Sequence, residues 1–193
     1  NYGYKLVYQI VTFLIPIVTI PYISRVFGAD GIGIQSFTNS IASYFILFAS
    51  LGTAVYGARE IAQSRDNVYH TTVIFWEVES IRVISTLICT AAWFIFIVFN
   101  EKYQVYYLLL TIQIVATAFD ITWFFEGQER FGAVVIKNSI VKIVNLIFVF
   151  TCIHKQSDLW IYIVSIGFFM IIGNLSLWGS IRKYLVKISI KEL

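Results

Sequence analysis

Six long apolar runs alternate with short polar segments along the whole chain. A helix needs about 20 mostly apolar residues to cross a bilayer, and each run has about that length. The runs lie near residues 6–27, 34–56, 78–99, 104–125, 132–153 and 159–181. The polar segments between them lie at 28–33, 57–70, 100–102, 126–130 and 154–158. The pattern predicts six helical spans joined by short connections.

Composition identifies the solvent that these helices require. Hydrophobic residues make up 59% of the chain and charged residues only 13%, whereas soluble domains have about 25% charged residues. A water-soluble domain of this composition would expose large apolar patches. The expected fold is therefore all-α, a polytopic transmembrane bundle of about six spans. The net charge of +3 is too small to indicate nucleic-acid binding.

The distribution of lysine and arginine predicts the orientation in the membrane. Cytoplasmic loops carry an excess of these residues. If the N-terminus is cytoplasmic, the inside segments hold nine basic residues: Lys5, Arg59, Arg65, Arg130, Lys137, Arg182, Lys183, Lys187 and Lys191. The outside segments then hold three, Arg25, Lys102 and Lys155. We therefore expect both termini on the cytoplasmic side.

Two charged residues are expected within the spans, where each costs at least about 2.5–3.5 kcal/mol. Lys142 lies near the middle of the fifth run, and Asp120 lies about 8 Å inside the cytoplasmic end of the fourth, at 1.5 Å per residue. Arg82 is expected to reach the cytoplasmic interface with Glu77 and Glu79, because the run after it is long enough to span.

Polar residues recur at helical spacing around these charges. Asn138, Lys142 and Asn145 share one helix face by spacing. Two further sets do so on other spans: Gln113, Thr117 and Asp120, and Ser36, Ser40, Ser43 and Ser50. For Asp120 and Lys142 the pattern favours a hydrated lumen, with a buried ion pair as the alternative. For the serines it favours hydrogen bonding between helices together with the packing of small residues.

Residues for catalysis or metal binding are scarce. The chain has two histidines, His70 and His154, and it has no HExxH, Walker A or GxSxG sequence. The GADGIG segment at 28–33 joins two spans and does not follow a strand, so we interpret it as a tight reversal between helices. The sequence therefore predicts neither an enzyme nor a bound cofactor.

Several segments together resemble one transporter family. PYISRVFGADGIG at 21–33, YGAREIA at 56–62 and DITWFFEGQERF at 120–131 are similar to loop and helix-end sequences of Wzx-type O-antigen repeat-unit flippases. DLWIYI at 158–163 and GNLSLW at 173–178 are similar to the sixth span of that family. The resemblance covers essentially the whole chain and places it in the N-terminal half of such a protein.

The resemblance implies a member of the multidrug/oligosaccharidyl-lipid/polysaccharide exporter superfamily, which has two helical lobes around a central cavity. Residues 1–193 would form one lobe, and the second lobe is not in this chain. The implied activity is the flipping of polyprenyl-diphosphate-linked oligosaccharide repeat units across the bacterial cytoplasmic membrane. Coupling to protons or sodium is open, and a polysaccharide polymerase and assembly proteins are implied partners.

The implied substrate suggests roles for individual residues. A diphosphate would be attracted to the cations Arg25, Arg59 and Lys142, and sugars would hydrogen-bond Asn138 and Asn145. Asp120 would neutralise Lys142 or carry a coupling proton. Three other functions stay open: a multidrug antiporter of the same superfamily, a membrane-embedded glycosyltransferase or acyltransferase lobe, and a scaffold for assembly proteins.

Overall fold

The computed structural model describes residues 2–186 and, for residues 2–8, 11, 131 and 133, the backbone alone. The described chain is helical throughout, without strands. Its α-helices are α1 (Tyr2–Ser50), α2 (Thr53–Gln63), α3 (Val68–Val98), α4 (Gln104–Ala116), α5 (Thr122–Gly127), α6 (Phe131–Cys152) and α7 (Leu159–Ile181). Short 3-10 helices lie between them: η1 (Glu101–Tyr103), η2 (Thr117–Phe119) and η3 (Gln156–Asp158). Lys187 and Lys191, two of the counted basic residues, lie outside the described residues.

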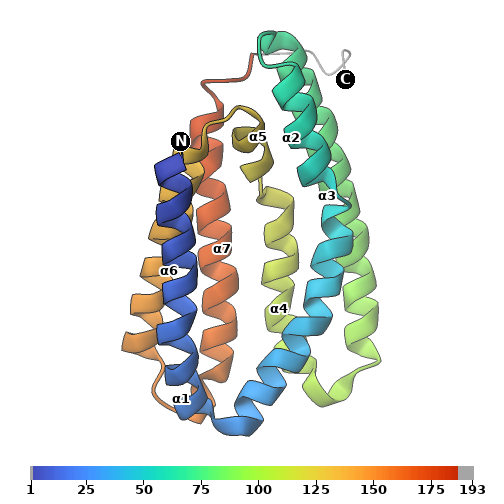
Figure 1. The fold of residues 1–193 in the computed structure, drawn as a ribbon. Coiled ribbons are helices and arrows are strands. Elements are labelled where there is room, and N and C mark those ends of the chain that lie inside the picture. The colour runs from blue at the N-terminus through green and yellow to red at the C-terminus, as the bar shows by residue number, and fades with distance from the viewer. Residues whose placement is uncertain (1, 187–193) are drawn as a thin grey trace.

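The first two expected spans are arms of one bent helix, α1. The reversal falls on a single residue, Gly28, whose φ of 66° and ψ of −176° are non-helical. Only glycine adopts this conformation without strain. The expected turn at 28–33 was therefore too long, because Gly31 and Gly33 already belong to the second arm. Figure 1 shows the chain changing direction at this bend.

The described part of the chain contains five helical stretches that are long and apolar enough to cross a membrane: Thr12–Gln63, Val68–Val98, Glu101–Gly127, Val134–Cys152 and Gln156–Ile181. The first has 52 residues, which is roughly 78 Å of helix at 1.5 Å per residue and more than twice a hydrocarbon core of about 30 Å. Because it reverses at Gly28, this stretch accounts for two of the six expected passes. The start of α1 and the end of α7 lie at the same end of the bundle (Figure 1).

The helices differ from the expected spans in three places. The second arm of α1 ends at Ser50, and α2 occupies part of the expected polar connection at 57–70. α3 begins at Val68, ten residues before the expected start. The fourth run is divided into α4, η2 and α5. In contrast, α6 and α7 cover almost the same residues as the last two apolar runs.

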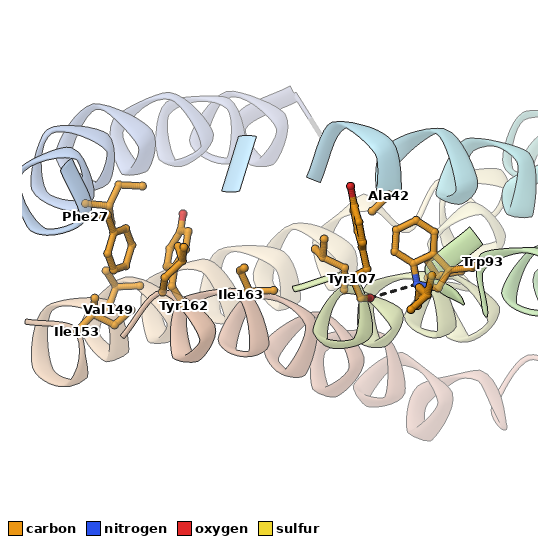
Figure 2. Packing of buried hydrophobic residues seen from close by; sticks show 13 residues of the cluster. Phe27, Ala42, Trp93, Tyr107, Val149, Ile153, Tyr162 and Ile163 are labelled. Carbon is orange, nitrogen blue, oxygen red and sulfur yellow. Dashed lines mark hydrogen bonds between the residues drawn. The ribbon is translucent and has the colours of Figure 1, made fainter. Parts of the chain in front are cut away.

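Two hydrophobic clusters hold the bundle together. The first joins both arms of α1 to α3, α4, α6 and α7, and includes Phe27, Trp93 and Tyr107. Within it Trp93 Nε1 donates a hydrogen bond to Tyr107 O at 3.2 Å, so the indole nitrogen is satisfied inside the bundle (Figure 2). The second cluster joins α2, α3, α5, the start of α6 and the end of α7 around Phe75 and Trp123. Charged and polar side chains lie between the two clusters.

Large apolar side chains also cover the outer faces of the bundle. Leu87, Ile88 and Ile95 on α3 are each more than 60% exposed, and Ile147 on α6 is 57% exposed. Water-soluble proteins rarely present such extended apolar surfaces. Lipid is the solvent that suits this outer face.

Candidate functional site

The fourth apolar run is broken near its end. α4 stops at Ala116, η2 follows, and the backbone at Asp120 is extended (φ −84°, ψ 96°) before α5 begins at Thr122. A break of this kind leaves backbone carbonyls without helical partners. In lipid, such groups must be satisfied by the protein itself.

Side chains of α7 hydrogen-bond two carbonyls at this break. Asn174 Nδ2 donates to Ala116 O at 2.9 Å, and Trp178 Nε1 donates to Phe119 O at 3.0 Å. Asn174 is 5% exposed. Both donors belong to the GNLSLW segment, and the carbonyls lie just before the DITWFFEGQERF segment. Two segments of the resemblance that are distant in sequence therefore meet at the break.

Arg82 on α3 supplies a third donor. Its Nη1 donates to Asp120 O, and its Nε donates to Thr53 Oγ1 at 3.0 Å. The expectation that Arg82 reaches the cytoplasmic interface was wrong, because its side chain is only 2% exposed. The early start of α3 explains the error: Arg82 lies fourteen residues, about 21 Å, from Val68.

The two glutamates grouped with Arg82 differ from each other. Glu77 is exposed, as expected for an interfacial residue. Glu79 is 3% exposed and lies among packed helices, so the expectation was wrong for this residue. Their separation by two positions turns them to different sides of α3.

A cavity of about 810 Å³ opens beside the break, between the first arm of α1, α5, α6 and α7. Eight of its eleven lining residues are polar or charged, although the surrounding helices are apolar. The polar lining residues are Gln9, Thr12, Asp120, Thr122, Glu126, Lys137, Asn138 and Asn174. Polar and ionisable groups inside a membrane bundle usually mark a substrate or ion path, so this cavity is the candidate functional site.

Lys137 is a central residue of the cavity, and no pattern in the sequence pointed to it as a site residue. Its Nζ donates to Asn174 Oδ1 at 3.2 Å, and it interacts electrostatically with Asp120. Asn174 therefore joins the lysine of α6 to the carbonyl of Ala116. The feature of the sequence that could have indicated Lys137 is its partner Asn174, a single amide inside an apolar helix of 23 residues.

Asp120 lines this cavity, but its local structure differs from the expectation. It was expected within a continuous helix, on one face with Gln113 and Thr117. In the structure it follows η2, and its Oδ1 accepts a hydrogen bond from Thr122 N at 3.1 Å. Its carboxylate therefore helps to begin α5. Gln113 and Thr117 are buried against the bundle and do not line the cavity.

The three polar residues of α6 lie toward the first arm of α1. Asn138 lines the large cavity, and Lys142 and Asn145 line a second cavity of about 290 Å³. Lys142 Nζ donates to Thr12 Oγ1 at 2.9 Å, and Thr12 also lines the large cavity. The prediction that Asn138, Lys142 and Asn145 share one helix face is confirmed.

The structure does not bring Asp120 and Lys142 into one cavity. Asp120 lines the large one and Lys142 the smaller one. The cations that interact electrostatically with Asp120 include Arg82 and Lys137. The Asp120–Lys142 pair stays a prediction, and Arg82 and Lys137 are charged neighbours of Asp120 that the sequence did not indicate.

Other expected site residues lie outside the cavities. Arg25 and Arg59 are exposed and line neither cavity. The hydroxyls of Ser40, Ser43 and Ser50 donate to carbonyls of their own helix. The expectation of hydrogen bonds between helices was therefore wrong for these serines, since a helical serine reaches the carbonyl three or four residues before it.

The described residues hold no group of three or more histidine, cysteine, aspartate or glutamate side chains placed to bind a metal ion. The cavity instead offers one lysine, two carboxylates and several amides and hydroxyls. Such groups can bind anionic and hydroxyl-rich molecules through hydrogen bonds and charge.

Comparisons with known proteins agree with the resemblance. The model of a family described as polysaccharide biosynthesis protein matches residues 1–192. A protein named as an O-antigen transporter in Escherichia coli (strain K12) is 25% identical over 162 residues, which cover 82% of this chain and 39% of that protein. One with the same name in Shigella dysenteriae is 24% identical over 177 residues, which cover 91% of this chain and 43% of that protein.

The chain spans about two fifths of the length of these curated relatives. No solved structure matches it. Its apolar helical stretches make it a membrane protein. The family model matches nearly all of its residues. The chain belongs to the polysaccharide biosynthesis protein family.

Proposed function

We propose that this chain is one lobe of a flippase that moves polyprenyl-diphosphate-linked oligosaccharide repeat units across the bacterial cytoplasmic membrane. The observation that carries the proposal is the polar cavity of about 810 Å³ inside an otherwise apolar helical bundle. Family membership and the names of the two curated relatives support it.

A flippase of this kind needs a hydrated path for the polar headgroup, while the polyprenyl tail stays in lipid. Lys137 and Asn138 lie in the cavity, and Lys142 follows them on the same helix. Ammonium groups bind phosphate oxygens through charge-assisted hydrogen bonds, and amides such as Asn138 can bind sugar hydroxyls. Transport by this route requires no covalent step and no catalytic residue.

Transport belongs to the full-length protein in this proposal. The chain spans about two fifths of its curated relatives, so a second lobe would close the other side of the path. Rocking of two lobes about a central site gives alternating access. The proposed partners are the lipid-linked oligosaccharide, the surrounding lipids, and a polysaccharide polymerase with its assembly proteins.

The proposed orientation has both ends of the lobe in the cytoplasm. The bias of nine basic residues against three supports it. The cavity then lies nearer the cytoplasmic end, since it lies beside the start of α6 and the end of α7. This is the side from which a lipid-linked precursor made in the cytoplasm would enter.

The test removes each cavity cation in the full-length protein. We expect Lys137→Gln and Lys142→Gln to reduce surface glycan several-fold at unchanged protein level in the membrane, and Lys142→Arg to retain part of it because the charge survives. Lys183→Gln is the matched control, since Lys183 is exposed at the end of α7. Normal glycan export by both Gln variants would contradict the proposal.

A further inference from the structure

Two helix breaks lie at a similar height in the bundle (Figure 1), and elements that flank each of them contact α3. The first separates α1 from α2 at Leu51 and Gly52, whose φ angles are 42° and 68°. The second is the break at Asp120. Arg82 connects them, because its guanidinium donates to Thr53 at the start of α2 and to the carbonyl of Asp120.

Other polar groups of α3 reach the same region. Ser85 Oγ donates to Ala49 O, in the last turn of α1 before the first break. Glu79 lies one turn before Arg82 on the same helix. We call the residues Glu79, Arg82, Ser85, Thr53 and Asp120 the junction. The junction lies between the two hydrophobic clusters, and its α3 side chains hydrogen-bond groups at both breaks.

Glu79 is the member of the junction whose hydrogen-bonding groups are unused. Its side chain is 3% exposed, and both carboxylate oxygens are buried without a hydrogen-bond partner. Among the described residues no ion pair includes Glu79. The guanidinium of Arg82 is engaged elsewhere, at Thr53 and at Asp120 O.

The charges around Glu79 are few. Arg82 on α3 and Asp120 after η2 act on it electrostatically, with opposite sign. The helices α4 and η2, which pack against α3, contain no charged residue. α2 contributes Arg59, which is exposed, and Glu60, which is half-buried; the second arm of α1 contributes only Asp30, near the Gly28 bend at the opposite end of the bundle. α5 and α7 also contact α3 through their aromatic side chains; α5 contributes the exposed carboxylate Glu126, and α7 contains no charged residue. Within the described part of these helices, no cation is therefore placed to neutralise Glu79 by direct contact.

An ionised carboxylate without hydrogen bonds is very costly in a low-dielectric interior, whereas the neutral acid costs much less. A metal cation is a poor alternative occupant, because the adjacent guanidinium repels it. A proton removes the charge without needing further ligands. These considerations select the proton among the small cations that a membrane protein meets.

We propose that Glu79 is a proton-binding site, protonated while the junction is closed as it is in this structure. When the junction opens to water, the O–H bond of the acid breaks and the proton passes to water. The carboxylate that remains attracts Arg82, which lies three residues further along the same helix. Arg82 then leaves the carbonyl of Asp120, and the break in the fourth span loses one of its three donors.

Proton occupancy therefore controls whether α3 holds the break beside the large cavity. The site differs from the cavity itself, because Glu79 does not line it. Binding of the proton requires neither a glycan nor transport, so the inference can fail or succeed independently of the flippase proposal.

The test is infrared difference spectroscopy of the full-length protein in lipid nanodiscs, titrated with pH. We expect a carbonyl stretch of a protonated carboxylic acid at neutral pH, absent from Glu79→Gln and retained in Glu77→Gln. Glu77 is the matched control, since it is an exposed glutamate on the same helix. Glu79→Asp should shift the band without removing it, which identifies the residue even where Glu79→Gln accumulates poorly.

Two results would overturn the proposal. One is a wild-type protein without an acid band at neutral pH, which would mean that Glu79 is ionised in the folded protein. The other is a band that is unchanged in both Glu79 variants, which would assign the proton to another acid. A band that responds to Glu79 alone supports the proposal.

Discussion

At the scale of the residue, Asn174 does the most to define the candidate site. Its amide nitrogen binds the carbonyl of Ala116, and its amide oxygen accepts from Lys137. One side chain of α7 therefore fixes both the break in the fourth span and the lysine of α6. Both donor and acceptor roles are filled, which is the arrangement that makes a buried polar residue stabilising.

Replacing Asn174 by alanine should therefore destabilise the lobe. The change leaves the buried carbonyl of Ala116 without this donor and removes the amide acceptor of Lys137, and an unsatisfied buried group costs about 1–3 kcal/mol. We expect a lower unfolding temperature for the full-length protein in detergent. Ser176→Ala is the control, because Ser176 is exposed and its hydroxyl donates only to Gly173 O of its own helix. Equal stability of the two variants would contradict this role of Asn174.

At the scale of the element, α1 shows how one residue can set the path of a 49-residue helix. Apolar side chains continue on both sides of Gly28, and only its left-handed φ reverses the chain. α2 and α5 depend on glycine for another reason. A Cβ at Gly57 would overlap the ring of Trp123, and one at Gly127 would lie 2.6 Å from Ala58 O. Glycine thus permits the close packing of these two helices.

Gly28→Ala should disturb the reversal of α1. The alanine is forced into a conformation that costs about 1–3 kcal/mol in non-glycine residues. We expect a lower unfolding temperature and a smaller yield of folded protein. Gly33→Ala should be neutral or slightly stabilising, because Gly33 is helical and a Cβ there would meet no atom within 4 Å. A stable Gly28→Ala variant would show that the bend tolerates a side chain.

Gly57→Ala should separate α2 from α5. The added methyl group collides with a buried Trp123 at the centre of the second hydrophobic cluster, and such overpacking typically costs about 1–3 kcal/mol. Thermal unfolding followed by tryptophan fluorescence measures the effect. Gly179→Ala on α7 serves as the control, since nothing lies within 4 Å of its added Cβ. The idea fails if both variants unfold at the wild-type temperature.

At the scale of the whole molecule, apolar side chains face outward and polar groups gather at the junction and in the cavities. This distribution suits a lobe that is surrounded by lipid on one side and faces a hydrated path on another. The first residues of α1 and the end of α7 share one end of the bundle (Figure 1), as an even number of passes requires. The charge bias predicts that this end is cytoplasmic.

Cysteine labelling from outside the cell tests this orientation. In a background without Cys89 and Cys152, we expect a membrane-impermeant maleimide to label Asp30→Cys and not Asp66→Cys. Asp66 is preferable to the neighbouring Arg65, whose guanidinium pairs with Glu129 at 3.1 Å. Asp30 and Asp66 are both exposed, so accessibility alone does not distinguish them. Labelling of position 66 without labelling of position 30 would reverse the orientation.

The sequence by itself determined that the chain is a helical membrane protein and where α6 and α7 begin and end. It also determined that Asn138, Lys142 and Asn145 share a helix face. These features follow from hydropathy and helical periodicity, which are local properties of the chain. The segments of the resemblance likewise indicate the family, because each is a short run of consecutive residues that can be recognised without its spatial neighbours.

Only the tertiary structure decided where the helices break and which charges are buried. The break at Asp120 is stable because Asn174, Trp178 and Arg82 donate to its carbonyls from helices distant in sequence. Arg82 was expected at the interface because nothing in its own helix indicates that Thr53 lies opposite. Lys137 was not expected in the cavity for the same reason, because its hydrogen-bond partner Asn174 belongs to another helix. Hydrogen-bond partners on other helices produce no periodic pattern in the sequence. Only the packing of the helices against each other could identify them.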